Sequence, residues 1–113
     1  MSITIGETRK YEFEGPFKIQ DWKPSYNAAV YAILKKSSRD GNYNLIYIGQ
    51  SENMADRGFY KSHHAYTCWL RNVNSEGELF IAIYFMPSST ENQRKEVESI
   101  LIKDYNPSCN KEV

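Results

Sequence analysis

The chain has 113 residues, of which 41% are hydrophobic and 25% are charged, and its 14 basic side chains balance its 14 acidic ones. This length is that of one domain, and the composition is ordinary for a soluble globular protein. A net charge of zero excludes a protein held on nucleic acid by bulk positive charge alone, although it allows a local basic groove.

The first 27 residues predict an N-terminal arm, packed on a core that spans residues 28–110. Apolar and polar residues alternate over 3–5 and again over 11–14, a period typical of β-strands. Gly15-Pro16 then breaks the pattern. We therefore expect one edge strand in this arm, and a single domain over residues 1–113.

A β-hairpin is predicted next. Ala28–Lys36 is rich in β-forming residues, and Leu45–Gly49 is a second short apolar run. Asp40-Gly41 lies between them, and glycine readily adopts the positive φ angles that tight hairpin turns need.

Two helices and a third strand follow. Ser51 is suited to cap a helix over Glu52–His64. Leu79–Met86 is an almost unbroken apolar run, so we expect a central strand that is covered on both faces. Thr90 and Gln93 form the pattern of a capping box, which predicts a last helix that ends at Pro107. The predicted fold is α+β, a small three-stranded antiparallel or mixed sheet flanked by helices.

Cys68 and Cys109 are predicted to be free thiols, because a chain of this length needs no disulfide for stability. No run approaches the roughly 20 apolar residues of a membrane span, and the start lacks the features of a signal peptide. These observations favour a cytoplasmic protein. The two cysteines and both histidines have the ligand types of a zinc centre but not its spacing.

A set of polar and aromatic residues recurs along the core. Ala29-Val30-Tyr31 and Tyr47-Ile48-Gly49 lie on the two hairpin strands, and Arg57 follows Gly49 by eight residues. Glu98 lies on the last helix, and Asn110 follows it in the tail. Together these features resemble the GIY-YIG nuclease family, named after two such tripeptides, over about three-quarters of the chain.

The resemblance implies a GIY-YIG-like fold and a metal-dependent endonuclease that hydrolyses phosphodiester bonds in DNA. Glu98 would bind the one divalent cation, Mg²⁺ or Mn²⁺, through a hard oxygen ligand. Gly49 and Asn110 would have structural roles at the site. The catalytic residues implied are Tyr31, Tyr47, Arg57, His63 and Glu98.

The chemistry of these side chains suits that reaction. The forked donors of Arg57 match the phosphoryl oxygens, whose negative charge grows during hydrolysis. Tyr47 would deprotonate the attacking water. Because the ordinary pKa of a phenol is about 10, its surroundings must first lower that pKa. His63 is the alternative base, and Tyr31 would orient the water or the phosphate. His63 and His64 are adjacent, so we expect at most one of them in the site.

A basic lip over the site is predicted to bind the nucleic acid. It would consist of Arg57, Lys61, His64 and Arg71. DNA is the expected substrate, and RNA is the alternative. Specificity for a target would come from a homodimer or from a partner protein.

Three departures from the family pattern accompany the resemblance, and one is the net charge of zero, which is low for a nuclease that binds duplex DNA unaided. Ala29 stands where the first motif has glycine, and Lys61 stands where relatives commonly have His or Tyr. The alternative function is therefore a catalytically inactive nucleic-acid-binding or protein-interaction module on the same fold. The alternative for Glu98 is a simple ion pair with Arg94, one helical turn away.

Overall fold

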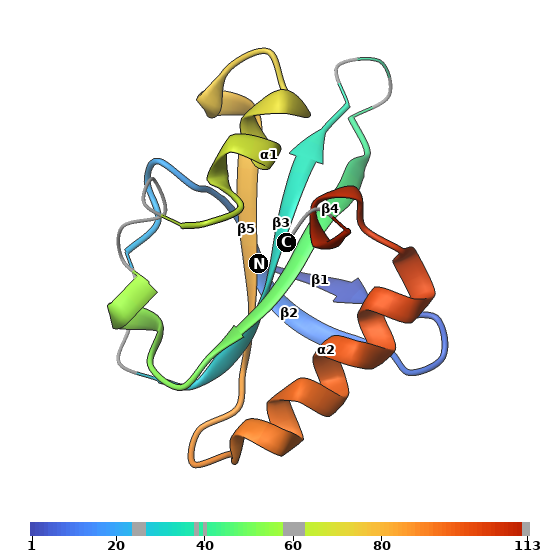
Figure 1. Cartoon of the computed structure of the whole chain (residues 1–113). Helices are drawn as coiled ribbons and strands as arrows, with labels where there is room; N and C mark the ends of the chain where they lie inside the picture. Colours follow the sequence, from blue (N-terminus) through green and yellow to red (C-terminus); the bar gives the residue numbers. More distant parts are fainter. Residues whose placement is uncertain (24–26, 38, 40, 58–62, 112–113) are drawn as a thin grey trace.

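The computed structural model describes residues 1–23, 27–37, 39, 41–57 and 63–111, apart from the side chains of Asp56 and Arg57. Within these residues, five strands form one antiparallel sheet in the order β1-β2-β5-β3-β4 (Figure 1). The strands are β1 (Ser2–Ile5), β2 (Tyr11–Lys18), β3 (Ala29–Lys36), β4 (Tyr43–Ser51) and β5 (Leu79–Phe85). The helices are α1 (Tyr66–Arg71) and α2 (Glu91–Tyr105), with short 3₁₀ turns η1 (Met54–Arg57), η3 (Glu76–Glu78) and η4 (Ser108–Asn110).

The N-terminal segment belongs to the sheet itself. A sheet flanked by helices is confirmed, but the prediction of three strands is wrong, because β1 and β2 extend the sheet beyond β5. Gly15-Pro16 does not end the strand. It lies inside β2, where the register against β5 shifts between Glu14 and Phe17, and this irregularity absorbs the two residues that suit a regular strand least.

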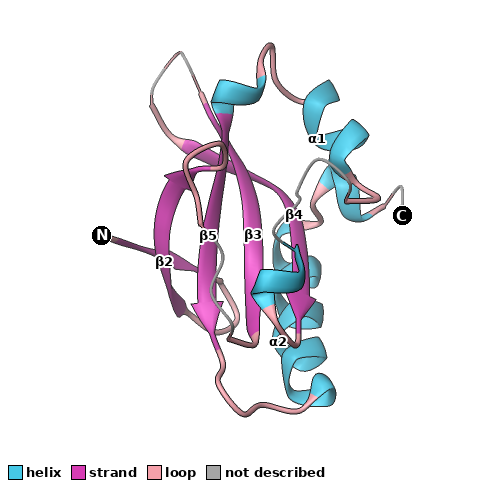
Figure 2. Cartoon of the chain, turned by 90° about the vertical axis from the view of Figure 1, so that its left-hand side faces the viewer, coloured by secondary structure: helices cyan, strands magenta, loops and turns pink. Residues whose placement is uncertain are grey.

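The hairpin and the central strand are confirmed. β3 and β4 pair over their whole length, although β4 is longer at both ends than predicted. Asp40 of the turn lies outside the described residues. β5 lies between β2 and β3 (Figure 2), and its side chains join the apolar clusters on both faces of the sheet, which explains its unbroken apolar sequence.

The helix predicted over Glu52–His64 is wrong in its described part. Ser51 is still in β4, and its hydroxyl exchanges hydrogen bonds with the backbone of Asn53 instead of capping a helix. Only the single turn η1 follows, and residues 58–62 lie outside the description. α1, which the sequence did not predict, begins after the histidines.

The last helix begins as predicted. Thr90 Oγ1 accepts a hydrogen bond from Gln93 N, and the Gln93 side chain accepts one from Thr90 N, so the capping box is complete. The helix ends at Tyr105 and is capped by Asn106, whose φ of 48° is left-handed, directly before Pro107. No helix among the described residues is long and apolar enough to cross a membrane.

Two apolar layers cover the sheet. On one side, which we call the tyrosine face, Tyr31 and Tyr47 pack under α1, η1 and the start of η4. On the other, the helix face, Val97 and Leu101 of α2 pack on β3, β4 and β5. β4 is an outer strand of the sheet, and α2 runs along it (Figures 1 and 2).

Candidate active site

Tyr31 of β3 and Tyr47 of β4 lie side by side on the tyrosine face. Tyr31 is opposite Gly49 in the antiparallel register and Tyr47 is opposite Ile33, so both rings point to the same side of the sheet. The ring centroids are 6.2 Å apart. Only 3% and 6% of the two residues is exposed, so the surrounding core fixes both rings.

Gly49 makes this arrangement possible. The Tyr31 ring lies directly over the Gly49 backbone, and a Cβ added at Gly49 would lie 2.4 Å from the Tyr31 Cζ and Oη atoms. No side chain fits in that distance. The glycine of the second tripeptide is therefore required by the position of the tyrosine of the first.

His63 contacts both tyrosines. Its Nε2 lies 2.7 Å from Tyr31 Oη, and its ring centroid is 5.2 Å from that of Tyr47. Its Nδ1 accepts a hydrogen bond from Ala65 N at 3.0 Å, so the ring proton is on Nε2. His63 therefore donates to Tyr31 Oη, and the hydroxyl proton of Tyr31 points in another direction.

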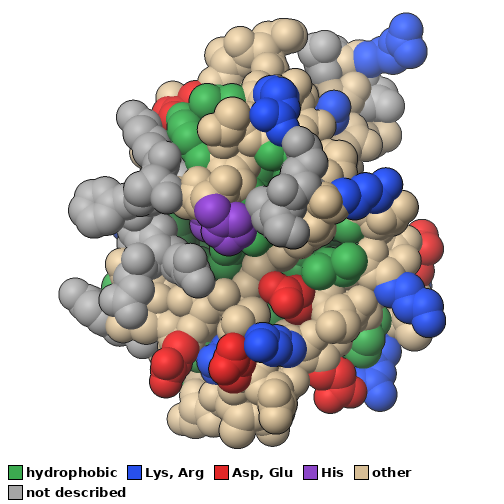
Figure 3. Space-filling model, viewed as in Figure 1, with side chains coloured by type: hydrophobic (Ala, Val, Ile, Leu, Met, Phe, Trp, Pro, Cys, Tyr) green, Lys and Arg blue, Asp and Glu red, His purple; other side chains and the backbone are tan. Residues whose placement is uncertain are grey.

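His64 lies over the second phenol. It stacks on His63 with the ring centroids 4.3 Å apart, and its Nε2 is 3.5 Å from Tyr47 Oη. Both histidines contact the tyrosine pair, His63 through Tyr31 and Tyr47 and His64 through Tyr47, so the prediction that at most one of them serves the site stays a prediction. His64 is the exposed member of the pair. Figure 3 shows the histidines near the centre of one face of the molecule, with charged side chains of both signs around them.

Asn110 attaches the C-terminal tail to the open edge of β4. Its Oδ1 accepts a hydrogen bond from Ile48 N, and its Nδ2 donates to Ile48 O, both at 2.8 Å. These backbone groups face outward from an edge strand and have no strand partner on that side. The amide thus fixes the backbone of the residue that follows Tyr47.

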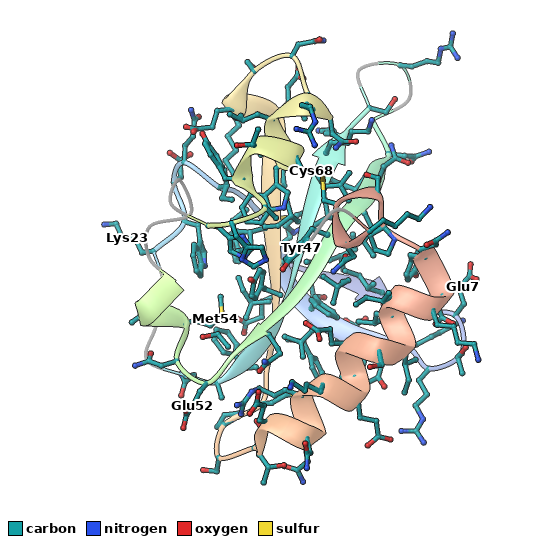
Figure 4. All side chains as sticks on the ribbon, viewed as in Figure 1. Glu7, Lys23, Tyr47, Glu52, Met54 and Cys68 are labelled. Atoms are coloured by element: carbon teal, nitrogen blue, oxygen red, sulfur yellow. A yellow bond between two sulfur atoms is a disulfide. The ribbon has the colours of Figure 1, made fainter. Side chains whose placement is uncertain are left out.

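Cys68 and Cys109 form a disulfide, so the prediction of free thiols is wrong. Their Cα atoms are 5.7 Å apart although 41 residues separate them in sequence, and both side chains are buried in the tyrosine face. The bond joins α1 to η4, close to Tyr47 (Figure 4). Because Asn110 follows Cys109, the disulfide and the amide hold the same segment.

Glu98 comes from the helix that covers the other face. At 100° per residue it lies on the flank of α2 opposite Asp104, which binds the turn between β1 and β2, so Glu98 lies on the flank that follows β4. The carboxylate is half-buried, and burial raises its pKa, while the Lys95 ammonium lowers it. Among the described residues it has no hydrogen bond or ion pair, and the pairing with Arg94 does not form.

The basic residues of the predicted site are described only in part. Arg57 ends η1, directly after the loop that leaves β4, but its side chain lies outside the described residues, as does the whole of Lys61. Arg71 is exposed at the C-terminal end of α1. The predicted contacts of Arg57 and Lys61 with a phosphate therefore stay predictions.

Glu98 fits a divalent cation in one respect. A half-buried carboxylate with no hydrogen bond among the described residues keeps its oxygen lone pairs for a hard cation, which would complete its coordination with water and phosphate oxygens. The described part of the chain holds no group of three or more His, Cys, Asp or Glu side chains that could share a metal ion. Glu98 as a single protein ligand thus suits a weakly bound ion that keeps most of its water ligands.

Comparisons with protein-family models, with curated proteins and with solved structures gave no match to this chain.

The sequence did not indicate two residues that the structure brings to notice, one in this cluster and one on the helix face. Trp69, which the sequence analysis did not single out, packs its ring against His63, with centroids 4.6 Å apart, and against Tyr47. The run His63-His64, followed after five residues by Trp69, was the available signal. Arg94 gave no signal, because an arginine on a helix is ordinarily exposed.

Proposed function

We propose that this chain is an endonuclease domain that hydrolyses phosphodiester bonds in DNA with one bound Mg²⁺ or Mn²⁺. The observation that carries the proposal is the cluster of Tyr31, Tyr47 and His63 around Gly49, to which His64 adds a second imidazole. Two phenols, each beside an imidazole, provide acid, base and hydrogen-bond donors within one small area.

Tyr47 takes the proton of the attacking water in this proposal. A phenol with its ordinary pKa of about 10 is a poor base at neutral pH, so it must first lose its own proton. His64 Nε2, 3.5 Å from Tyr47 Oη, is positioned to accept that proton and release it to solvent. The phenolate then accepts a proton from water, and the hydroxide attacks phosphorus.

Tyr31 orients the substrate. Tyr31, held by the hydrogen bond from His63, would orient the phosphate or the attacking water. Arg57 would neutralise charge on the phosphoryl oxygens. Glu98 would hold the divalent cation, which when bound stabilises the charge that develops on the leaving oxygen.

The test is cleavage of supercoiled plasmid with Mg²⁺ or Mn²⁺. We expect Tyr47→Phe to lower the rate by about 10² to 10⁴, the usual contribution of an acid–base group. Glu98→Gln should abolish the dependence on metal and leave DNA binding largely intact. Glu96→Gln is the matched control, because it removes the same charge from an exposed position on α2.

If the plasmid stays intact with every metal and at every pH while the protein retards DNA in a gel, the endonuclease proposal is wrong. The inactive binding module is then favoured. Equal loss of DNA binding in Glu98→Gln would exclude its role as a metal ligand. The same assay with RNA and with short duplexes decides the substrate, and the molecular mass in solution decides between a monomer and a homodimer.

The proposed location is the cytoplasm. Disulfides are uncommon in that reducing compartment, so the Cys68–Cys109 bond removes one reason for this assignment. Alkylation of the cysteines in freshly lysed cells, followed by mass measurement, tests it: unmodified, bonded cysteines would argue against the cytoplasm.

A further inference from the structure

Arg94 is a buried cation without a carboxylate partner. It is 3% exposed, and its Nε donates to Gln50 Oε1 at 2.9 Å. Its Nη1 donates to Ser89 O at 2.7 Å and to Ser89 Oγ at 2.9 Å. All three acceptors are neutral, and no carboxylate of the described residues forms an ion pair with it. A buried guanidinium without an ion-paired counter-ion is disfavoured, so an anion bound directly to it would stabilise it.

A cavity of about 340 Å³ opens beside this guanidinium, where β4 ends and α2 begins. Gln50, Ser89 and Thr90 line it with Arg94, and the exposed carboxylates Glu52 and Glu91 also border it. Figure 4 shows Glu52 on the loop after β4, next to the first turn of α2. Gln50 and α2 lie on the helix face, so this cavity is separate from the tyrosine pair.

The groups around the cavity are mostly hydrogen-bond donors. Nη2 of Arg94 has no partner among the described residues. The Ser89 and Thr90 oxygens already accept hydrogen bonds, so their hydroxyl protons are available to an acceptor. Gln50 uses its oxygen on Arg94, which leaves its NH₂ group. The first amides of α2 have no helical acceptor, and the helix dipole favours negative charge there.

We propose that this cavity binds a phosphate group, with Arg94 as its buried cation and the start of α2 as its second source of donors. The proposal is independent of phosphodiester hydrolysis. Glu52 and Glu91 oppose the anion, and the pairing of Glu91 with Lys95, 3.2 Å away, offsets part of that repulsion. The two carboxylates provide a test, because removing the charge of either one must raise the affinity for phosphate.

Inorganic phosphate is the probe, titrated into isotopically labelled protein at constant ionic strength and followed by NMR. Saturable shifts are expected at the amides of Glu91 and Asn92. Glu91→Gln and Glu52→Gln should each tighten binding by about fivefold through the lost repulsion, while Glu96→Gln, away from the cavity, leaves it unchanged. Arg94→Gln should abolish the shifts.

Several outcomes overturn the site. They are shifts that do not saturate, equal binding by Arg94→Gln, or no tightening in Glu91→Gln and Glu52→Gln. If Arg94→Gln does not fold, the two glutamate variants decide, since both positions are exposed. Oligonucleotides with and without a 5′-phosphate then separate the sources: binding only with the terminal phosphate assigns a monoester, and equal binding assigns the backbone diester.

Discussion

The position of the Tyr31 ring depends on the absence of a side chain at Gly49. A methyl group at Gly49 would overlap the Tyr31 ring, 2.4 Å from its Cζ and Oη, so the ring must move away from His63. We expect Gly49→Ala to lower the free energy of unfolding by about 1–3 kcal/mol through overpacking. Plasmid cleavage should fall with it, because the hydroxyl leaves its position.

Gly77→Ala is the matched control for this variant. The nearest atoms to a Cβ at Gly77 are 3.7 Å away, an ordinary contact, so the same loss of backbone freedom occurs without overlap. Urea unfolding of both variants measures the difference. Wild-type stability in Gly49→Ala would show that the Tyr31 ring does not depend on this contact.

The two histidines also differ at the level of single atoms. Both ring nitrogens of His63 have protein partners, so His63 holds Tyr31 in place. His64 is exposed and faces Tyr47 through one nitrogen. The sequence favoured His63 as the alternative base because the ordinary pKa of histidine lies near neutral pH. In the proposed mechanism the contacts favour His64 for proton transfer and His63 for positioning.

At the level of elements, α2 carries two carboxylates whose pKa values move in opposite directions. Hydrogen bonds from Thr8, and from the backbone of Glu7, lower the pKa of Asp104. Burial raises the pKa of Glu98. A carboxylate whose pKa is lowered by folding stabilises the protein at pH values above the pKa of the unfolded chain, and this stabilisation is lost as the pH falls. A raised pKa has the reverse effect, since the ionised form is disfavoured in the folded chain.

Asp104→Asn should therefore melt at a lower temperature than the wild type at pH 7, and the difference should shrink as the pH falls below the ordinary value of 3.8. Glu98→Gln should match the wild type below pH 4.5 and melt at a higher temperature as the pH rises above it. Melting curves across this range check both. A Glu98→Gln variant that is less stable at neutral pH would mean that the carboxylate has a stabilising partner.

Elements that are specified by residues close together in the sequence were predictable. The capping box at Thr90 and the hairpin between β3 and β4 need only neighbours in sequence. The pairing of β2 with β5 was not predictable, because the two strands are about 60 residues apart and nothing in β2 specifies its partner. The helix after Ser51 failed for a local reason: its hydroxyl is used by the loop at Asn53.

At the scale of the whole molecule, the site depends on contacts that close long loops. The residue types and order of Tyr31, Tyr47 and Asn110 could be read from the sequence, since the resemblance supplied them. Their assembly could not, because it needs the C-terminal segment to cross the edge of β4 and bond to α1 through Cys109. No spacing in the sequence indicates that crossing.

The Cys68–Cys109 bond is the largest of these constraints. It closes a segment whose ends are 41 residues apart, and the loss of chain entropy in the unfolded state predicts a stabilisation of about 4 kcal/mol. Protein refolded under reductant, or the Cys68→Ala/Cys109→Ala variant, should lose about that much free energy of unfolding. The amide proton of Ile48 should also exchange faster with solvent, because Asn110 is then held by its own two hydrogen bonds alone.

Asn110→Ala with the disulfide intact is the control that separates the two effects. It removes the bonds to Ile48, worth about 1 kcal/mol each, but keeps the loop closed, so its loss of stability should be the smaller one. If reduced protein with two free thiols unfolds at the same urea concentration as the oxidised form, the bond does not constrain the chain. The tail would then be held at β4 by Asn110 and packing, and the tyrosine pair would keep its geometry in either redox state.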